Sequence, residues 1–117
     1  MKPTLALDFD GVLHQYTGFR GDTIIDGGPV PGAVEFVQAA QESFDVVIHS
    51  ARAKTRFGRR AIQAWLTENG FPYLEIAAEK PPAHVTLDDR ALCFTGTFPD
   101  PDALLQFRPW WKQLEAV

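Results

Sequence analysis

The chain has 117 residues, of which 45% are hydrophobic and 22% charged, and its formal net charge is −4. This balance is typical of one globular domain over residues 1–117 and excludes a disordered or fibrous chain. An acidic surface also disfavours general nucleic-acid binding, which depends on Lys and Arg neutralising phosphates. No apolar run approaches the roughly 20 residues that cross a bilayer, so we expect a cytoplasmic protein without a membrane partner.

Short apolar runs alternate with helix-like stretches, which predicts an α/β fold on a mainly parallel sheet. We expect strands at residues 4–9, 44–49, 73–76 and 85–87, and a short fifth strand at 92–94. We expect one helix to begin at Pro31, a second to run over about 57–69, and a third to follow an Asp100 cap. Pro109 should split that last helix. The glycine-rich stretch of about 11–30 predicts a tight turn and a loose hairpin or flap. The single cysteine, Cys93, lies in an apolar run and is predicted to be buried.

Two aspartates stand at the end of the first predicted strand. Asp8 and Asp10 flank Phe9, so the alternation of side chains along a strand places both carboxylates on one side. Burying carboxylates costs free energy unless cations or hydrogen bonds compensate for the lost water. Ligands bind at the carboxyl edge of open α/β sheets, so the pair indicates a site, although a turn before Gly11 also explains it.

Further polar residues lie near the ends of the other predicted strands. Ser50 ends the second strand, where its hydroxyl could bind a phosphoryl oxygen or cap the strand end. Lys80 precedes two prolines, which hold it away from helical geometry, and taken alone it is better explained as a surface lysine. Asp88 and Asp89 end the fourth strand, and adjacent carboxylates repel each other unless a cation joins them. Hard oxygen ligands of this kind suit Mg²⁺.

The order of these residues resembles the haloacid dehalogenase superfamily of phosphohydrolases. Its DxDG motif matches Asp8 to Gly11, its hydroxyl matches Ser50, its lysine matches Lys80, and its diacid matches Asp88 and Asp89. The resemblance covers about residues 4–94. It implies a Rossmann-like three-layer sandwich with a mainly parallel five-stranded sheet, of order 5-4-1-2-3, and no cap domain.

The resemblance implies a phosphatase that hydrolyses a phosphate monoester in two steps. Asp8 would attack phosphorus and form an aspartyl-phosphate, which splits one hard step into two. Asp10 would protonate the leaving oxygen and then activate water. Ser50 would bind the transferring group, and Lys80 would complete a positive clamp around it.

The resemblance also implies a Mg²⁺ cofactor and a cradle of backbone amides. The ligands would be the Asp8 side chain, the Asp10 backbone carbonyl and the diacid, with Asp89 binding directly or through water. Which of Asp88 and Asp89 touches the metal stays open at this point. The amides of Gly11 and Ala51 would help to hold the phosphoryl group.

Substrate preference is less well defined by the sequence. The two gaps in which relatives insert caps are short, so we expect an open site that suits a phosphorylated substrate of bulky or macromolecular kind. Basic residues crowd the predicted start of the second helix against its dipole, where solvated side chains and anion recognition are equally good explanations. They are Arg52, Lys54, Arg56, Arg59 and Arg60, with Arg52 expected to reach the site and the loop residue His14 a weaker candidate.

Three alternatives to a small-molecule phosphatase remain open. The basic cluster favours a phosphatase for polynucleotide ends, whereas the acidic composition disfavours nucleic acid as a partner. A phosphoacceptor signalling domain uses similar residues, but in a different order along the chain. A non-catalytic binding domain has no support, because every expected catalytic position is filled.

Trp110 and Trp111 are predicted to pack the tail onto the domain.

Overall fold

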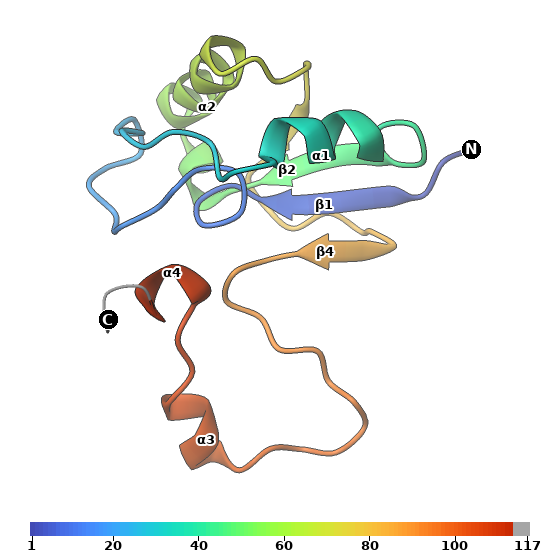
Figure 1. Cartoon of the computed structure of the whole chain (residues 1–117), viewed down its shortest axis with the longest axis vertical. Coiled ribbons are helices and arrows are strands. Elements are labelled where there is room, and N and C mark those ends of the chain that lie inside the picture. Colours follow the sequence, from blue (N-terminus) through green and yellow to red (C-terminus); the bar gives the residue numbers. More distant parts are fainter. Residues whose placement is uncertain (114–117) are drawn as a thin grey trace.

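The computed structural model describes residues 1–113 and shows an α/β fold on one parallel sheet (Figure 1). The sheet has four strands in the order β3-β2-β1-β4, and every neighbouring pair is parallel. The elements in chain order are β1 (Thr4–Asp8), α1 (Ala33–Ala40), β2 (Asp45–His49), the 3-10 helix η1 (Ala51–Lys54), α2 (Arg56–Glu68), β3 (Glu75–Ala77), β4 (Val85–Leu87), α3 (Pro101–Leu105) and α4 (Trp110–Gln113).

β1 is an inner strand of the sheet, and its sequence explains why. Leu5, Ala6 and Leu7 are all buried, as expected for a strand covered on both faces. In the parallel register, Asp8 of β1 lies opposite His49 of β2, and Leu7 lies opposite Leu87 of β4. The residues that follow β1, β2 and β4 therefore emerge at one edge of the sheet.

Helices α1 and α2 cover the same face of the sheet. Val37 of α1 and Ile62 and Trp65 of α2 pack in one apolar cluster with Leu7 of β1 and Ile48 of β2. The connections β1-α1-β2 and β2-α2-β3 both step in the same direction, so right-handed crossovers put both helices on one side. The return from β3 to β4 crosses the other face through residues 78–84, which contain Pro81 and Pro82 and no helix. A helical layer on that face, as in the expected three-layer sandwich, is absent from the described residues.

The predicted fifth strand is wrong. Residues 92–94 join no strand in the described part of the chain, and the segment from Arg90 to Asp100 is exposed throughout. Figure 1 shows it looping away from β4 before α4 returns to the side where β1 and β4 end. Cys93 is consequently exposed, and its predicted burial is also wrong, because burial depended on a strand that does not form.

The first predicted helix start is also corrected. α1 begins at Ala33 rather than Pro31, because Gly32 lies in the left-handed region, with φ 86, and turns the chain before the helix. The Asp100 cap is confirmed: its carboxylate accepts from the Asp102 amide at 3.0 Å. Pro109 stands between α3 and α4, as predicted.

The loop between β1 and α1 is closed at its base rather than formed as a hairpin. The Gln15 amide donates to the Gly28 carbonyl at 2.9 Å, and the Val30 amide donates to the Leu13 carbonyl at 2.8 Å. The predicted hairpin at about 16–25 forms no ladder among the described residues. The loop therefore closes on itself, residues 28–30 against residues 13–15, before α1 begins. No helix within residues 1–113 is long and apolar enough to span a membrane.

Candidate active site

Three carboxylates meet where β1 and β4 end. Oxygen atoms of Asp8, Asp88 and Asp89 all lie within 4.8 Å of one another, and the three side chains are half-buried. Parallel pairing of β1 with β4 produces this cluster, because Asp8 ends one strand and the two other acids directly follow its neighbour. The predicted meeting of these three residues at one sheet edge is therefore present in the structure.

Burial, together with the neighbouring acids, raises the pKa of Asp8 from 3.8 to about 8. Burial is the largest cause, followed by a hydrogen bond with the Asp89 side chain and the charges of Asp88 and Asp89. The Phe9 amide opposes the shift by donating to Asp8 Oδ1 at 2.9 Å. A divalent cation would relieve the same repulsion, and the donors are hard carboxylate oxygens. The donor set therefore fits a metal ion such as Mg²⁺.

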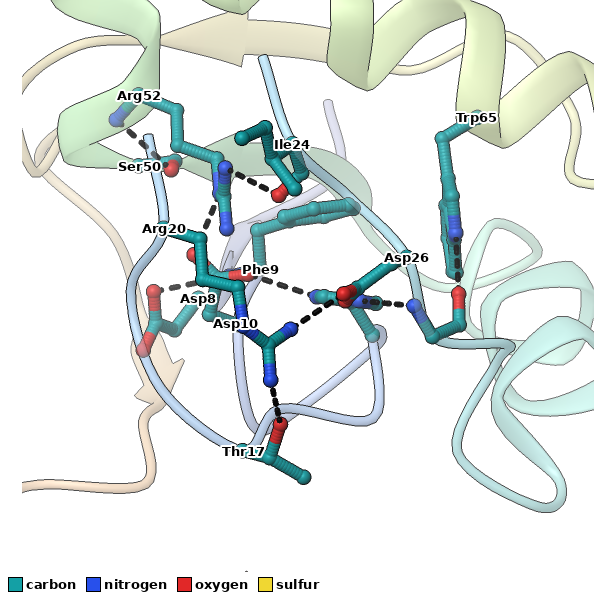
Figure 2. Close-up of polar contacts among 12 residues, drawn as sticks. Asp8, Phe9, Asp10, Thr17, Arg20, Ile24, Asp26, Ser50, Arg52 and Trp65 are labelled. Carbon is teal, nitrogen blue, oxygen red and sulfur yellow. Dashed lines mark hydrogen bonds and ion pairs between the residues drawn. The ribbon is translucent and has the colours of Figure 1, made fainter. Parts of the chain in front are cut away.

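Asp10 belongs to a second, separate cluster. Its Oδ2 accepts from Arg52 Nε at 2.8 Å (Figure 2). Its Oδ1 lies 2.8 Å from His14 Nδ1. The Gly27 amide donates to His14 Nε2 at 3.0 Å, so the ring proton belongs on Nδ1 and points to Asp10. Burial alone would raise the pKa of Asp10, but the hydrogen bonds and the charge from His14 and Arg52 lower it. Asp10 is thus held as a carboxylate and is not part of the cluster formed by Asp8, Asp88 and Asp89.

Arg52 reaches Asp10, as the expectation that it reaches the site requires, and its predicted substrate-binding role stays a prediction. It is only 2% exposed and ion-pairs with Asp10. Its Nη1 donates to the carbonyls of Gly21, Asp22 and Ile24 at 2.7, 3.0 and 3.1 Å. A buried guanidinium needs such partners, because its donors would otherwise lose water without compensation. Arg52 therefore links the loop after β1 to Asp10.

Ser50 and Gly11 have local hydrogen-bonding roles. Ser50 is buried, and its Oγ accepts from the Arg52 amide at 3.2 Å as the cap of η1. This contact uses an oxygen lone pair and leaves the hydroxyl hydrogen for another acceptor. The Gly11 amide donates to the His14 carbonyl at 2.9 Å, so it serves the turn rather than a ligand in this structure. The predicted role of the Ala51 amide, at the start of η1, stays a prediction.

Lys80 is not brought into contact with the acids. It is exposed in the β3–β4 connection, and within residues 1–113 it forms no ion pair or side-chain hydrogen bond. It does line one groove with Asp88, along the edge of β4 that carries no further strand. The structure therefore places Lys80 on the same side of β4 as the diacid, and its predicted clamp role stays a prediction.

Two contacts and one unpaired group at the site are not indicated by the sequence motifs. Trp111 Nε1 donates to Asp89 Oδ2 at 2.6 Å, and Trp110 Nε1 donates to the Gly11 carbonyl at 2.7 Å. The predicted packing of the tail onto the domain is confirmed, and it takes place at the acid cluster. His49 lies beside Asp8 in the register, and its buried Nε2 has no hydrogen-bond partner among the described residues.

The raised pKa of Asp8 predicts how stability depends on pH when metal is removed. A folded carboxyl that binds its proton more tightly than the unfolded one contributes stability that is complete below its unfolded pKa of 3.8 and is lost as the pH rises through about 8. The slope reaches about 1.4 kcal/mol per pH unit. Asp10, with its lowered pKa, acts in the opposite sense and only toward the acid end of this range.

Urea unfolding in EDTA should therefore give a lower free energy of unfolding at about pH 8 than at about pH 5. Asp8→Asn should remove most of this difference, because the amide does not titrate. The same fall in stability in wild type and variant would show that Asp8 does not keep its proton in the folded state.

Comparison of the chain with protein-family models gives no match, and comparisons with curated proteins and with solved structures give no significant match. Function has therefore to be inferred from the residues and their geometry.

Proposed function

We propose that the protein is a Mg²⁺-dependent phosphatase that hydrolyses a phosphate monoester through an aspartyl-phosphate on Asp8, as the resemblance to haloacid dehalogenase phosphohydrolases implies. The observation that carries the proposal is the division of the acids into two clusters. Asp8 lies with Asp88 and Asp89, whereas Asp10 lies with His14 and Arg52. One chain thus holds a carboxylate suited to attack beside a cation and another that His14 and Arg52 keep ionised, ready to accept a proton.

In the first step, an Asp8 carboxylate oxygen attacks phosphorus while the bond from phosphorus to the ester oxygen breaks. The leaving oxygen takes a proton from Asp10, so Asp10 has to be protonated when substrate reacts. In the second step, water attacks phosphorus, gives its proton to Asp10 and releases the Asp8 carboxylate. The ion pair with Arg52 and the hydrogen bond from His14 support the ionised form of Asp10 that accepts this proton.

Asp8, Asp88 and Asp89 would hold the Mg²⁺, which supplies positive charge that shields Asp8 from the phosphate. The predicted Asp10 carbonyl ligand completes the same proposal. Ser50 has a hydroxyl hydrogen to donate to a phosphoryl oxygen. Lys80 shares a groove with Asp88, which supports its proposed role as a positive clamp.

Two members of the basic cluster that favours the polynucleotide alternative have partners within the domain. The polynucleotide alternative depends on a basic cluster led by Arg52, and that side chain is buried against Asp10. Arg59 donates to the Ala53 carbonyl, so it too has a local partner. Lys54, Arg56 and Arg60 are exposed, so part of the cluster remains accessible to an anion. We therefore keep the polynucleotide alternative as an arm of the experiment.

The experiment measures phosphate release from p-nitrophenyl phosphate, from nucleotides and from a phosphorylated oligonucleotide, each with Mg²⁺ and with EDTA. We expect release from at least one ester, loss of release in EDTA, and recovery when Mg²⁺ is added back. Preference for the oligonucleotide over all small esters would favour the polynucleotide alternative. Release that is equally fast in EDTA would contradict the proposed metal site.

A further inference from the structure

The tail of the described chain carries a side chain that contacts the acid cluster directly. Trp111 is 6% exposed, and its indole N–H donates to Asp89 Oδ2 at 2.6 Å. The edge of the ring packs against Tyr16 at 5.1 Å between centroids, and the Arg90 guanidinium lies 5.4 Å from the ring centroid. The indole is therefore held between the loop after β1 and the loop after β4.

The two atoms of this hydrogen bond, Trp111 Nε1 and Asp89 Oδ2, both lie close to the backbone of Gly11 in the turn after β1. A Cβ atom placed on Gly11 would lie 2.2 Å from Asp89 Oδ2 and 3.0 Å from Trp111 Nε1, and Gly11 has φ 84. Only glycine accommodates both that backbone angle and that close approach. The position of the Asp89 carboxylate is thus limited on one side by the Gly11 backbone and on another by the indole.

The chain around Asp89 supplies little other support. Residues 90–100 are exposed, and β4 ends at Leu87. Asp88 is held locally, since its Oδ1 accepts from the Arg90 amide at 2.8 Å. Asp89 instead accepts from the Trp111 indole, and its other hydrogen bond is to Asp8 within the acid cluster. The orientation of Asp89 therefore depends on a residue 22 positions further along the chain.

We propose that Trp111 is a positioning residue that holds the Asp89 carboxylate in place for a divalent cation, so that the C-terminal α4 forms part of the metal site. The inference rests on the metal site of the proposed function. A donor that orients a ligating carboxylate lowers the cost of fixing it, and loss of such a partner typically weakens metal binding by about 10- to 100-fold. Asp8, Asp88 and Asp89 would hold the cation between them, while the indole holds Asp89 Oδ2.

The test compares Trp111→Phe with wild type, because phenylalanine keeps an aromatic ring against Tyr16 and removes only the N–H donor and part of the ring. The matched control is Trp110→Phe, which removes the neighbouring indole that donates to a main-chain carbonyl. Mg²⁺ affinity is measured by calorimetry without substrate, and circular dichroism checks the fold. We expect Trp111→Phe to bind Mg²⁺ about tenfold or more weakly, and Trp110→Phe to change the affinity much less.

A second measurement uses wild type alone and does not depend on the variant folding. The three tryptophans each give one indole N–H signal in a two-dimensional NMR spectrum. Mg²⁺ should shift the Trp111 signal, whereas the Trp65 signal should stay in place, because that indole donates to the Gly27 carbonyl away from the acids.

The outcomes separate this inference from the proposed function. Unchanged affinity in Trp111→Phe, or Mg²⁺ binding that leaves the Trp111 signal unmoved, would overturn the positioning role and leave the metal site standing. A wild-type protein that binds no Mg²⁺ at all would overturn both. Equal losses of affinity in Trp111→Phe and Trp110→Phe would show that the loss comes from disturbed packing of the tail, and they would also overturn the inference.

Discussion

Asp8→Asn should lower the rate of phosphate release by about a thousandfold or more, as expected when the nucleophile of a covalent mechanism is removed. The amide cannot form the acyl-phosphate bond, and it also removes one of the three carboxylates that would hold the cation. The fold should survive, because asparagine has the same shape and relieves repulsion from Asp88 and Asp89. The measurement is Mg²⁺-dependent release from whichever ester wild type hydrolyses, with circular dichroism as the check on folding.

A matched control for this variant lies at the other end of the sheet. Asp45 is an exposed aspartate that begins β2, and Asp45→Asn makes the same chemical change far along the strands from the acid cluster. It should leave the rate close to that of wild type. Activity that persists in a folded Asp8→Asn protein at the level of Asp45→Asn would mean that Asp8 is not the nucleophile.

Arg52→Met should give the largest loss of stability among single changes at the site, about 3 kcal/mol in the free energy of unfolding. Arg52 is 2% exposed, and Met replaces its volume but none of its donors. The change leaves Asp10, itself only 19% exposed, without its ion pair, and it leaves three loop carbonyls without their shared donor. Urea unfolding measures the effect, and the exposed Arg60 on α2 supplies the control Arg60→Met.

A double variant separates the two causes of this loss. Combining Arg52→Met with Asp10→Asn removes the unpaired charge but not the unpaired carbonyls, so it should be more stable than the sum of the two single changes predicts. Simple additivity would indicate that the Arg52–Asp10 ion pair contributes nothing beyond its separate parts. A loss in Arg52→Met no larger than that in Arg60→Met would contradict the buried role of Arg52.

The predictable parts of the fold are those that depend on local sequence. Apolar runs predict the positions of the strands, because a strand covered on both faces needs them. Since parallel strands end at one edge, the amino-acid sequence alone is enough to place Asp8, Asp88 and Asp89 together, as the structure does. The Asp100 cap follows from a hydrogen bond between residues that are close in sequence.

The contacts that the sequence does not predict join residues far apart in the chain. Arg52 is expected to meet substrate, yet it pairs with Asp10 across 42 positions, and no local pattern distinguishes the two destinations. The sequence around Trp111 does not predict its hydrogen bond with Asp89, which lies 22 positions earlier in the chain. The run at residues 92–94 resembles a strand in composition but finds no partner in the described part of the chain, so the predicted burial of Cys93 is wrong. Burial depends on the partner that covers a segment, which the segment itself does not encode.

The central claim is that a covalent phosphoryl group forms on Asp8. Its most direct test is rapid acid quenching of the wild-type protein during turnover of the best ester with Mg²⁺, followed by mass spectrometry of the peptide that contains Asp8. We expect a hydroxylamine-sensitive phosphoryl group on that peptide, formed fast enough to account for turnover and absent from Asp8→Asn. Turnover without any phosphorylated enzyme, or a phosphoryl group on another residue, would contradict the mechanism.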